Sequence, residues 1–245
     1  MAALRAEDDR PWGWRPVVVP LAALAALIVA TLVLGTTVRA HSDQQSLAYA
    51  VSINVAIEVL LALAVWFAGK DVAARYGGWG RTFGLRAPRL ADIPYISAGF
   101  AIALGARFII AIGANILTRG RAGREAENVS LGHVTPAAVA LLIFVAVICA
   151  PVIEELVFRG LMLRTFMRAM RFWPAAILSS LVFALLHTYE VSTLAGALTL
   201  SGVVGTLAMT NCVLVRLTDR LTPGIAVHAI SNGMTVLLVV LLSSG

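Results

Sequence analysis

Apolar residues fill long runs of this chain, and short polar segments rich in arginine separate the runs. A helix needs about 20 mainly apolar residues to cross the hydrocarbon core of a bilayer. The pattern predicts helical spans near 17–38, 47–69, 93–117, 136–157, 173–188, 193–215 and 223–243. We therefore expect an all-α, polytopic transmembrane helical bundle of about seven spans, with residues 1–245 forming a single domain.

The composition and the placement of the positive charges support this interpretation. Hydrophobic residues make up 60% of the 245 residues and charged residues only 13%, which excludes an ordinary soluble domain. The net charge of +6 does not indicate nucleic-acid binding, because the basic residues lie between the spans rather than in one tail. Most of them fall in the N-terminal tail and in 69–92, 159–171 and 216–220. The positive-inside rule then places the N-terminus in the cytosol. Lys70 is the only lysine among them, and this preference for arginine favours an integral protein of a bacterial cell membrane.

A few ionisable residues fall within or at the ends of the predicted spans. A charge at the centre of a span costs about 2.5–3.5 kcal/mol on insertion scales, so such residues are rare and usually functional. They are Glu58, Arg107, Glu154, Glu155, Arg159, His187 and His228.

Two adjacent glutamates and an arginine end the fourth apolar run. Glu155 and Arg159 are four residues apart with the acid first, which is the favourable order for a helical ion pair, and Glu154 is left without that partner. Pro151 removes a backbone N–H and frees a carbonyl, as in helices whose backbone lines a cavity. The alternative is a helix end that meets the cytosol, where such charges are ordinary.

His187 follows Phe183 by one turn, so the aromatic ring and the imidazole share one helix face. If the fourth and fifth spans form a hairpin that turns near Met170 and Arg171, Glu154 lies about 16 residues before the turn and His187 about 16 after it. The two side chains would then stand at the same height and could meet. Taken alone, a histidine near the end of a span is more often an interfacial residue.

His228 and Asn232 are four residues apart in the last span and point the same way. By themselves they also fit a polar pair that joins two helices. Combined with the residues above, they bring a carboxylate pair, two imidazoles and an amide from three helices, a set that resembles a hydrolytic site.

The three motifs are Glu154-Glu155-x-x-x-Arg159, Phe183-x-x-x-His187 and His228-x-x-x-Asn232. In order and spacing they resemble those of the CAAX-protease and bacteriocin-processing (CPBP or Abi) family of intramembrane endopeptidases, to which type II CAAX prenyl proteases belong. The resemblance covers the expected catalytic core, 136–243, and 1–135 carry no motif.

The resemblance implies that the chain hydrolyses a peptide bond with a water that Glu154 activates. His187 would assist, and His228 and Asn232 would stabilise the oxyanion. Glu155, tied to Arg159, and Phe183 would support these groups. The implied partners are the lipid bilayer and a peptide or membrane-protein substrate.

The requirement for a metal is open at this point. Members of this family are often classed as metalloproteases, and Glu154, His187 and His228 could hold a zinc ion with an open fourth position. The usual His-Glu-x-x-His helix is absent, however, and general-base hydrolysis can be drawn from the same residues. We favour a mechanism that requires no metal.

Two other classes of function compete with a protease. A small proton- or ion-coupled transporter also carries intramembrane acids and histidines, but it usually shows repeat symmetry, which the sequence lacks. A non-catalytic membrane immunity scaffold would not need His187 at the height of Glu154.

Glu58 and Arg107 lie outside the three motifs. Glu58 is eleven residues from the outer end of the second span and Arg107 ten from that of the third, so their depths nearly match. Because an unpaired charge is costly there, we expect a structural ion pair between them, remote from the site.

Overall fold

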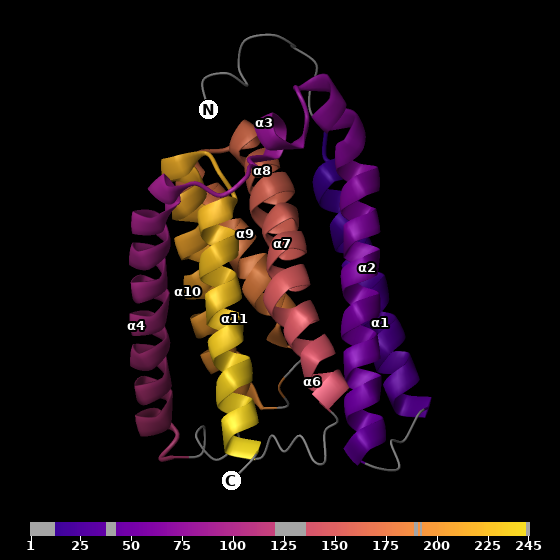
Figure 1. Cartoon of the computed structure of the whole chain (residues 1–245), viewed down its shortest axis with the longest axis vertical. Helices are drawn as coiled ribbons and strands as arrows, with labels where there is room; N and C mark the ends of the chain where they lie inside the picture. Colours follow the sequence, from indigo (N-terminus) through magenta and orange to yellow (C-terminus); the bar gives the residue numbers. More distant parts are fainter. Residues whose placement is uncertain (1–12, 38–42, 121–135, 189–190, 192, 244–245) are drawn as a thin grey trace.

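A computed structural model of the chain describes residues 13–37, 43–120, 136–188, 191 and 193–243, and this part is helical without any strand. The long helices run roughly side by side along the longest axis, and the short α3 lies at one end (Figure 1). The elements are α1 (Arg15–Thr37), α2 (Asp43–Arg75), α3 (Trp79–Phe83), η2 (Leu90–Asp92), α4 (Ile93–Leu117), α6 (Pro136–Ile143), η3 (Phe144–Cys149), α7 (Ala150–Glu155), η4 (Leu156–Met162), α8 (Leu163–Ala169), α9 (Phe172–Leu186), α10 (Leu194–Thr218) and α11 (Thr222–Ser243). The predicted all-α class is confirmed.

The outer surface of the bundle is apolar. Ile109 and Leu117 on α4 and Leu198 on α10 are 74%, 85% and 66% exposed, which water would disfavour and lipid would not. Among the described residues, Leu90–Leu117 and Leu194–Thr218 are long and apolar enough to cross a membrane. Both coincide with predicted spans.

The segment from α6 to α8 is one long helix that two π-helical turns, η3 and η4, interrupt on either side of the glutamate pair. At the end of η3 the Ala150 N–H donates to the carbonyl of Val145, five residues back. The next donor in that pattern would be residue 151, which is a proline without an N–H. The carbonyl of Ala146 therefore has no donor within its own helix, as the proline predicted.

The helical hairpin turns where the sequence predicted. Helix α8 ends at Ala169 and α9 begins at Phe172, which leaves Met170 and Arg171 as the turn. The Ser179 hydroxyl on α9 donates to the Phe158 carbonyl on η4 at 3.0 Å, so the two arms are joined below the turn. Helix α9 also packs against α10.

Helix α4 packs closely on α10 and α11 through Gly99. A Cβ atom at this position would come within 2.9 Å of Leu214 Cδ1 and 3.1 Å of Val227 Cγ2, so the glycine permits the short approach. In Figure 1, α4 stands at one side of the bundle beside α10 and α11, and α1 and α2 stand at the other.

A buried charged cluster fixes the start of α11. Arg220 Nε lies 3.1 Å from Asp92 Oδ1, Arg164 Nη1 lies 2.9 Å from Asp219 Oδ1, and both arginines are almost fully buried. The Leu221 N–H donates to the carbonyl of Gly84 at 2.9 Å. Because these contacts precede the first turn of α11, they set how far His228 lies along the bundle.

The predicted ion pair between Glu58 and Arg107 is wrong: no salt bridge joins them in the described structure. Arg107 Nη1 instead donates to the Thr235 hydroxyl on α11 at 2.8 Å. Their depths were matched, but depth does not decide which helices are neighbours. Helix α4 packs on α10 and α11, whereas α2 packs on α1 and the α6–α7 segment.

Candidate active site

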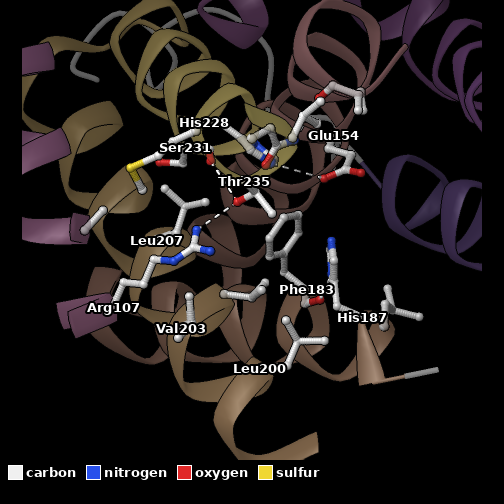
Figure 2. Close-up of a pocket in the computed structure, with 18 of the residues that line it drawn as sticks. Arg107, Glu154, Phe183, His187, Leu200, Val203, Leu207, His228, Ser231 and Thr235 are labelled. Atoms are coloured by element: carbon white, nitrogen blue, oxygen red, sulfur yellow. Dashed lines mark hydrogen bonds and ion pairs between the residues drawn. The ribbon is translucent and has the colours of Figure 1, made fainter. Parts of the chain in front are cut away.

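A cavity of about 900 Å³ opens between the helices and is lined mainly by apolar side chains. The four predicted catalytic residues all line it: Glu154, His187, His228 and Asn232. Glu58 and Arg107 line it as well, so neither is remote from the candidate site as predicted. Figure 2 shows Glu154, His187 and His228 around Phe183, with Arg107 on the opposite side.

Glu155 lies behind the cavity wall and is completely buried. Its Oε1 atom accepts a hydrogen bond from Asn211 Nδ2 at 2.8 Å and lies 3.1 Å from both His228 Nδ1 and Arg159 Nη1. The predicted pairing of Glu155 with Arg159 is therefore present. An ionised carboxylate that collects three donors is a rigid anchor for them.

Arg159 is also completely buried, and its guanidinium carbon lies 4.5 Å from the centre of the Phe183 ring. Phe183 in turn packs against the rings of His187 and His228, with centroids 4.5 and 5.8 Å away. The phenyl ring thus fills the space between the arginine and both imidazoles. Stacking of a cation on one face of an aromatic ring adds attraction beyond packing.

The His228 imidazole bridges the two glutamates. Its Nδ1 atom lies 3.1 Å from Glu155 Oε1, and because a carboxylate can only accept, Nδ1 carries the proton and donates. Its Nε2 atom lies 3.7 Å from Glu154 Oε2, at the cavity (Figure 2). His228 is therefore oriented from behind, and its second nitrogen is aimed at the reacting space.

Glu154 is the more accessible of the two acids, because its side chain is 17% exposed whereas that of Glu155 is fully buried. Its Oε2 atom has no hydrogen-bond partner. Adjacent residues on a helix point about 100° apart, which explains why one glutamate lines the cavity and the other lies behind it. A carboxylate in a cavity wall can bind and deprotonate a water molecule.

His187 lies at the C-terminal end of α9, and its Nδ1 atom is 2.8 Å from the carbonyl of Phe183. A carbonyl only accepts, so Nδ1 donates, and Nε2 is the ring nitrogen left for another partner. No hydrogen bond or ion pair joins His187 to Glu154 in the described structure. Both side chains border one cavity, but the meeting that the hairpin geometry predicted is not present as a direct contact.

Asn232 is held by the carbonyl that Pro151 leaves free. Its Nδ2 atom donates to the Ala146 carbonyl at 2.8 Å. One N–H of the amide is thereby fixed, and the second N–H of the same NH₂ group remains for another acceptor. The proline on one helix and the amide on another thus act together in placing this side chain.

The residues do not form a preassembled zinc site. Within the described ranges, no group of three or more His, Cys, Asp or Glu side chains is placed to hold a metal ion. Of the three candidate ligands, only Glu154 and His228 lie near each other. His187 and His228 both use Nδ1 for another contact and keep Nε2 available, so the question of a metal stays a prediction.

Two buried residues of the site were not predicted from the sequence. Asn211 on α10 is completely buried and donates to both Glu155 and the Gly224 carbonyl, the latter at 3.2 Å. Gly224 brings α11 against this pair, since a Cβ there would lie 3.3 Å from Asn211 Cγ and 3.4 Å from Glu155 Oε2. A buried amide in an apolar span was the available signal for Asn211.

Comparison with known families gives one match. The family model described as type II CAAX prenyl endopeptidase Rce1-like matches residues 136–234, a segment that contains all three motifs. This confirms the resemblance noted from the motifs. No curated protein and no solved structure matches the chain.

Proposed function

We propose that this chain, whose residues 136–234 match the Rce1-like family model of type II CAAX prenyl endopeptidases, is an intramembrane endopeptidase that hydrolyses a peptide bond with a glutamate-activated water. The family implies a hydrolase that acts on a peptide or protein. The apolar helices indicate an integral membrane protein. The assignment of roles within the site is our own.

Glu154 acts as the general base. A water bound at the Glu154 carboxylate, whose Oε2 atom lies 3.7 Å from His228 Nε2, gives one proton to the carboxylate while its oxygen attacks the carbonyl carbon of the peptide bond. The carbon–oxygen π electrons move onto the carbonyl oxygen, and a tetrahedral oxyanion results. The low polarity of the cavity wall strengthens each of these interactions.

His228 and Asn232 stabilise the oxyanion. With Nδ1 committed to Glu155, His228 donates through Nε2 as an imidazolium, and the adjacent Glu155 carboxylate balances that charge. Asn232 donates through the N–H that Ala146 does not use. Preorganised donors of this kind are each worth about 10²–10³-fold in kcat.

Collapse of the intermediate breaks the carbon–nitrogen bond. The proton that Glu154 took from the water passes to the departing nitrogen, which leaves as an amine. The other product is a carboxylic acid, which gives its remaining proton to the released amine and becomes a carboxylate. The Nε2 atom of His187, which carries a lone pair at the cavity, assists by accepting a hydrogen bond from the water before attack.

The membrane arrangement forms part of the proposal. All seven predicted spans would cross the membrane of a bacterial cell with the N-terminus in the cytosol. The charged cluster at the start of α11 would then lie on the cytosolic side. The cavity opens between spans, which suits an extended peptide or a segment of a membrane protein.

The observation that carries the proposal is the His228 ring between two inequivalent glutamates, one fully buried and one at the cavity. The test uses purified protein in detergent micelles, a defined library of short synthetic peptides, and mass spectrometry of the products. We expect the wild type to cleave some peptides, and Glu154→Ala, His187→Ala and His228→Ala to lose about 10²–10⁴-fold in rate.

The matched control is Asp71→Asn, an exposed carboxylate on α2 that should leave cleavage unchanged. Thermal unfolding of each variant shows whether it has lost activity because a catalytic group is missing or because the protein no longer folds. A folded Glu154→Ala protein that cleaves at the wild-type rate would remove Glu154 from the mechanism.

A further inference from the structure

Arg107 is a cation inside the cavity without an acidic partner. In the part of the chain that the structure describes, its one hydrogen bond is to Thr235, and no carboxylate lies within ion-pair distance. A neutral hydroxyl does not balance a guanidinium charge in apolar surroundings. Most of its five N–H donors therefore remain for another group.

The acids that line the cavity do not fill this role. Glu58 is 8% exposed, projects from α2 and keeps an unpartnered Oε2 atom, and Glu154 is near His228. Figure 2 shows the Arg107 guanidinium reaching toward Thr235 from the side opposite Glu154. The Arg107 guanidinium therefore lines the cavity, and no carboxylate among the described residues neutralises its charge.

The position of Arg107 relative to the reacting groups follows from α11. Thr235, its partner, lies seven residues after His228, which is two helical turns on the same face. Ser231 and Asn232 lie between them on this face and also line the cavity. At about 1.5 Å per residue, the guanidinium stands about 10 Å from the level of His228. An extended peptide advances about 3.3 Å per residue, so this distance spans about three residues.

We propose that Arg107 binds a carboxylate of the substrate about three residues from the scissile bond. The planar guanidinium fits a carboxylate with two parallel hydrogen bonds, and the Thr235 hydroxyl holds it in place. The carboxylate is either the free C-terminus of the peptide or an acidic side chain, which share this chemistry. This inference rests on the proposed function, because it takes Glu154 and His228 as the point of cleavage.

The test compares matched peptides from the same library. Each cleaved peptide is made with a C-terminal carboxylate or a C-terminal amide, and with Glu or Gln at the third residue on each side of the bond. We expect the wild type to prefer one carboxylate-bearing form. Arg107→Gln should lower kcat/KM for that form by about 10–100-fold, mainly through KM, and should leave the neutral form within a few-fold.

Two further variants complete the design. Arg107→Lys keeps the charge without the planar fork and should retain part of the preference. Arg171→Gln, an exposed arginine in the turn between α8 and α9, should retain all of it. The rate on the neutral peptides reports whether each variant is folded.

The outcomes separate this inference from the proposed function. If Arg107→Gln lowers cleavage of acid and neutral peptides alike, or keeps the wild-type preference, the subsite is wrong while the endopeptidase stands. A preference for the free C-terminus or for the acidic side chain identifies which carboxylate binds. If the wild type cleaves no peptide, or if Glu154→Ala cleaves every peptide that the wild type cleaves, the proposed function fails and the subsite fails with it.

Discussion

Asn211→Ala should damage the site without touching any group that meets the substrate. The Asn211 amide donates to Glu155 Oε1 at 2.8 Å and to the Gly224 carbonyl at 3.2 Å, and it joins α10 to both α7 and α11. Its removal leaves the fully buried Glu155 with fewer donors.

The magnitude follows from the kind of hydrogen bond. Hydrogen bonds between helices in membranes average about 0.6 kcal/mol, because the unfolded chain also finds partners. A hydrogen bond to a charged group is worth about 1.5–3 kcal/mol, and Glu155 is paired with Arg159. The charged acceptor dominates, so we expect Asn211→Ala to lower the free energy of unfolding by about 2–3 kcal/mol. Activity should also fall by about 10²-fold, since Glu155 orients His228 and a small misplacement is costly.

The assay is equilibrium unfolding in mixed detergent micelles, together with kcat on a cleaved peptide. Thr210→Ala is the matched control. Thr210 is the preceding residue on α10 and is also buried, but its hydroxyl bonds only the Thr206 carbonyl of its own helix. If Asn211→Ala costs no more stability than Thr210→Ala and keeps the wild-type kcat, then Glu155 does not depend on α10 and our account of the anchor is wrong.

Three other predictions concern packing, metal and topology. Gly224→Ala should lower the rate of peptide cleavage about 10-fold or more, because the added methyl group pushes α11 away from Glu155. Gly113→Ala is the control and should be neutral, because a Cβ there meets nothing within 4 Å. Equal effects of the two changes on cleavage would contradict the close contact at Gly224. Exhaustive chelation should leave the cleavage rate within a few-fold of that of the untreated protein. This expectation is wrong if elemental analysis finds one zinc per chain and activity is lost and regained together with that zinc. Single cysteines placed at 88 and 170 in a cysteine-free background should react with a membrane-impermeant thiol reagent only from the cytosolic side, and labelling of intact cells from outside would invert the proposed orientation.

Lipid made the presence of the helices predictable, although α2 and the α6–α8 segment continue to Arg75 and Ala169, past the predicted ends at 69 and 157. A backbone in hydrocarbon must satisfy its own hydrogen bonds, so apolar runs of sufficient length have few alternatives to helix. The turn at Met170 and Arg171, the Glu155–Arg159 pair and the carbonyl freed by Pro151 all follow from local spacing. Each of these depends on residues within about one or two turns of one another.

The sequence pattern could not predict which helices contact one another. The depth of Glu58 and Arg107 could be counted, but the lateral order of the helices could not, and that order decided the partner of Arg107. Asn211 and Gly224 were overlooked for the same reason, because their importance comes from the meeting of α10 and α11 with Glu155. Sequence spacing describes one helix at a time, whereas this site is made by several.

The contributions of α11 have a consequence for biosynthesis. This helix carries both proposed oxyanion donors, His228 and Asn232, as well as Thr235, the support of Arg107. Glu154 and His187 come from earlier helices and enter the membrane first. A ribosome-bound chain that has not yet released α11 holds a base without its complementary donors. Under the proposed mechanism, hydrolysis would therefore wait until α11 has joined the bundle, and a growing chain would not attack its neighbours in the membrane.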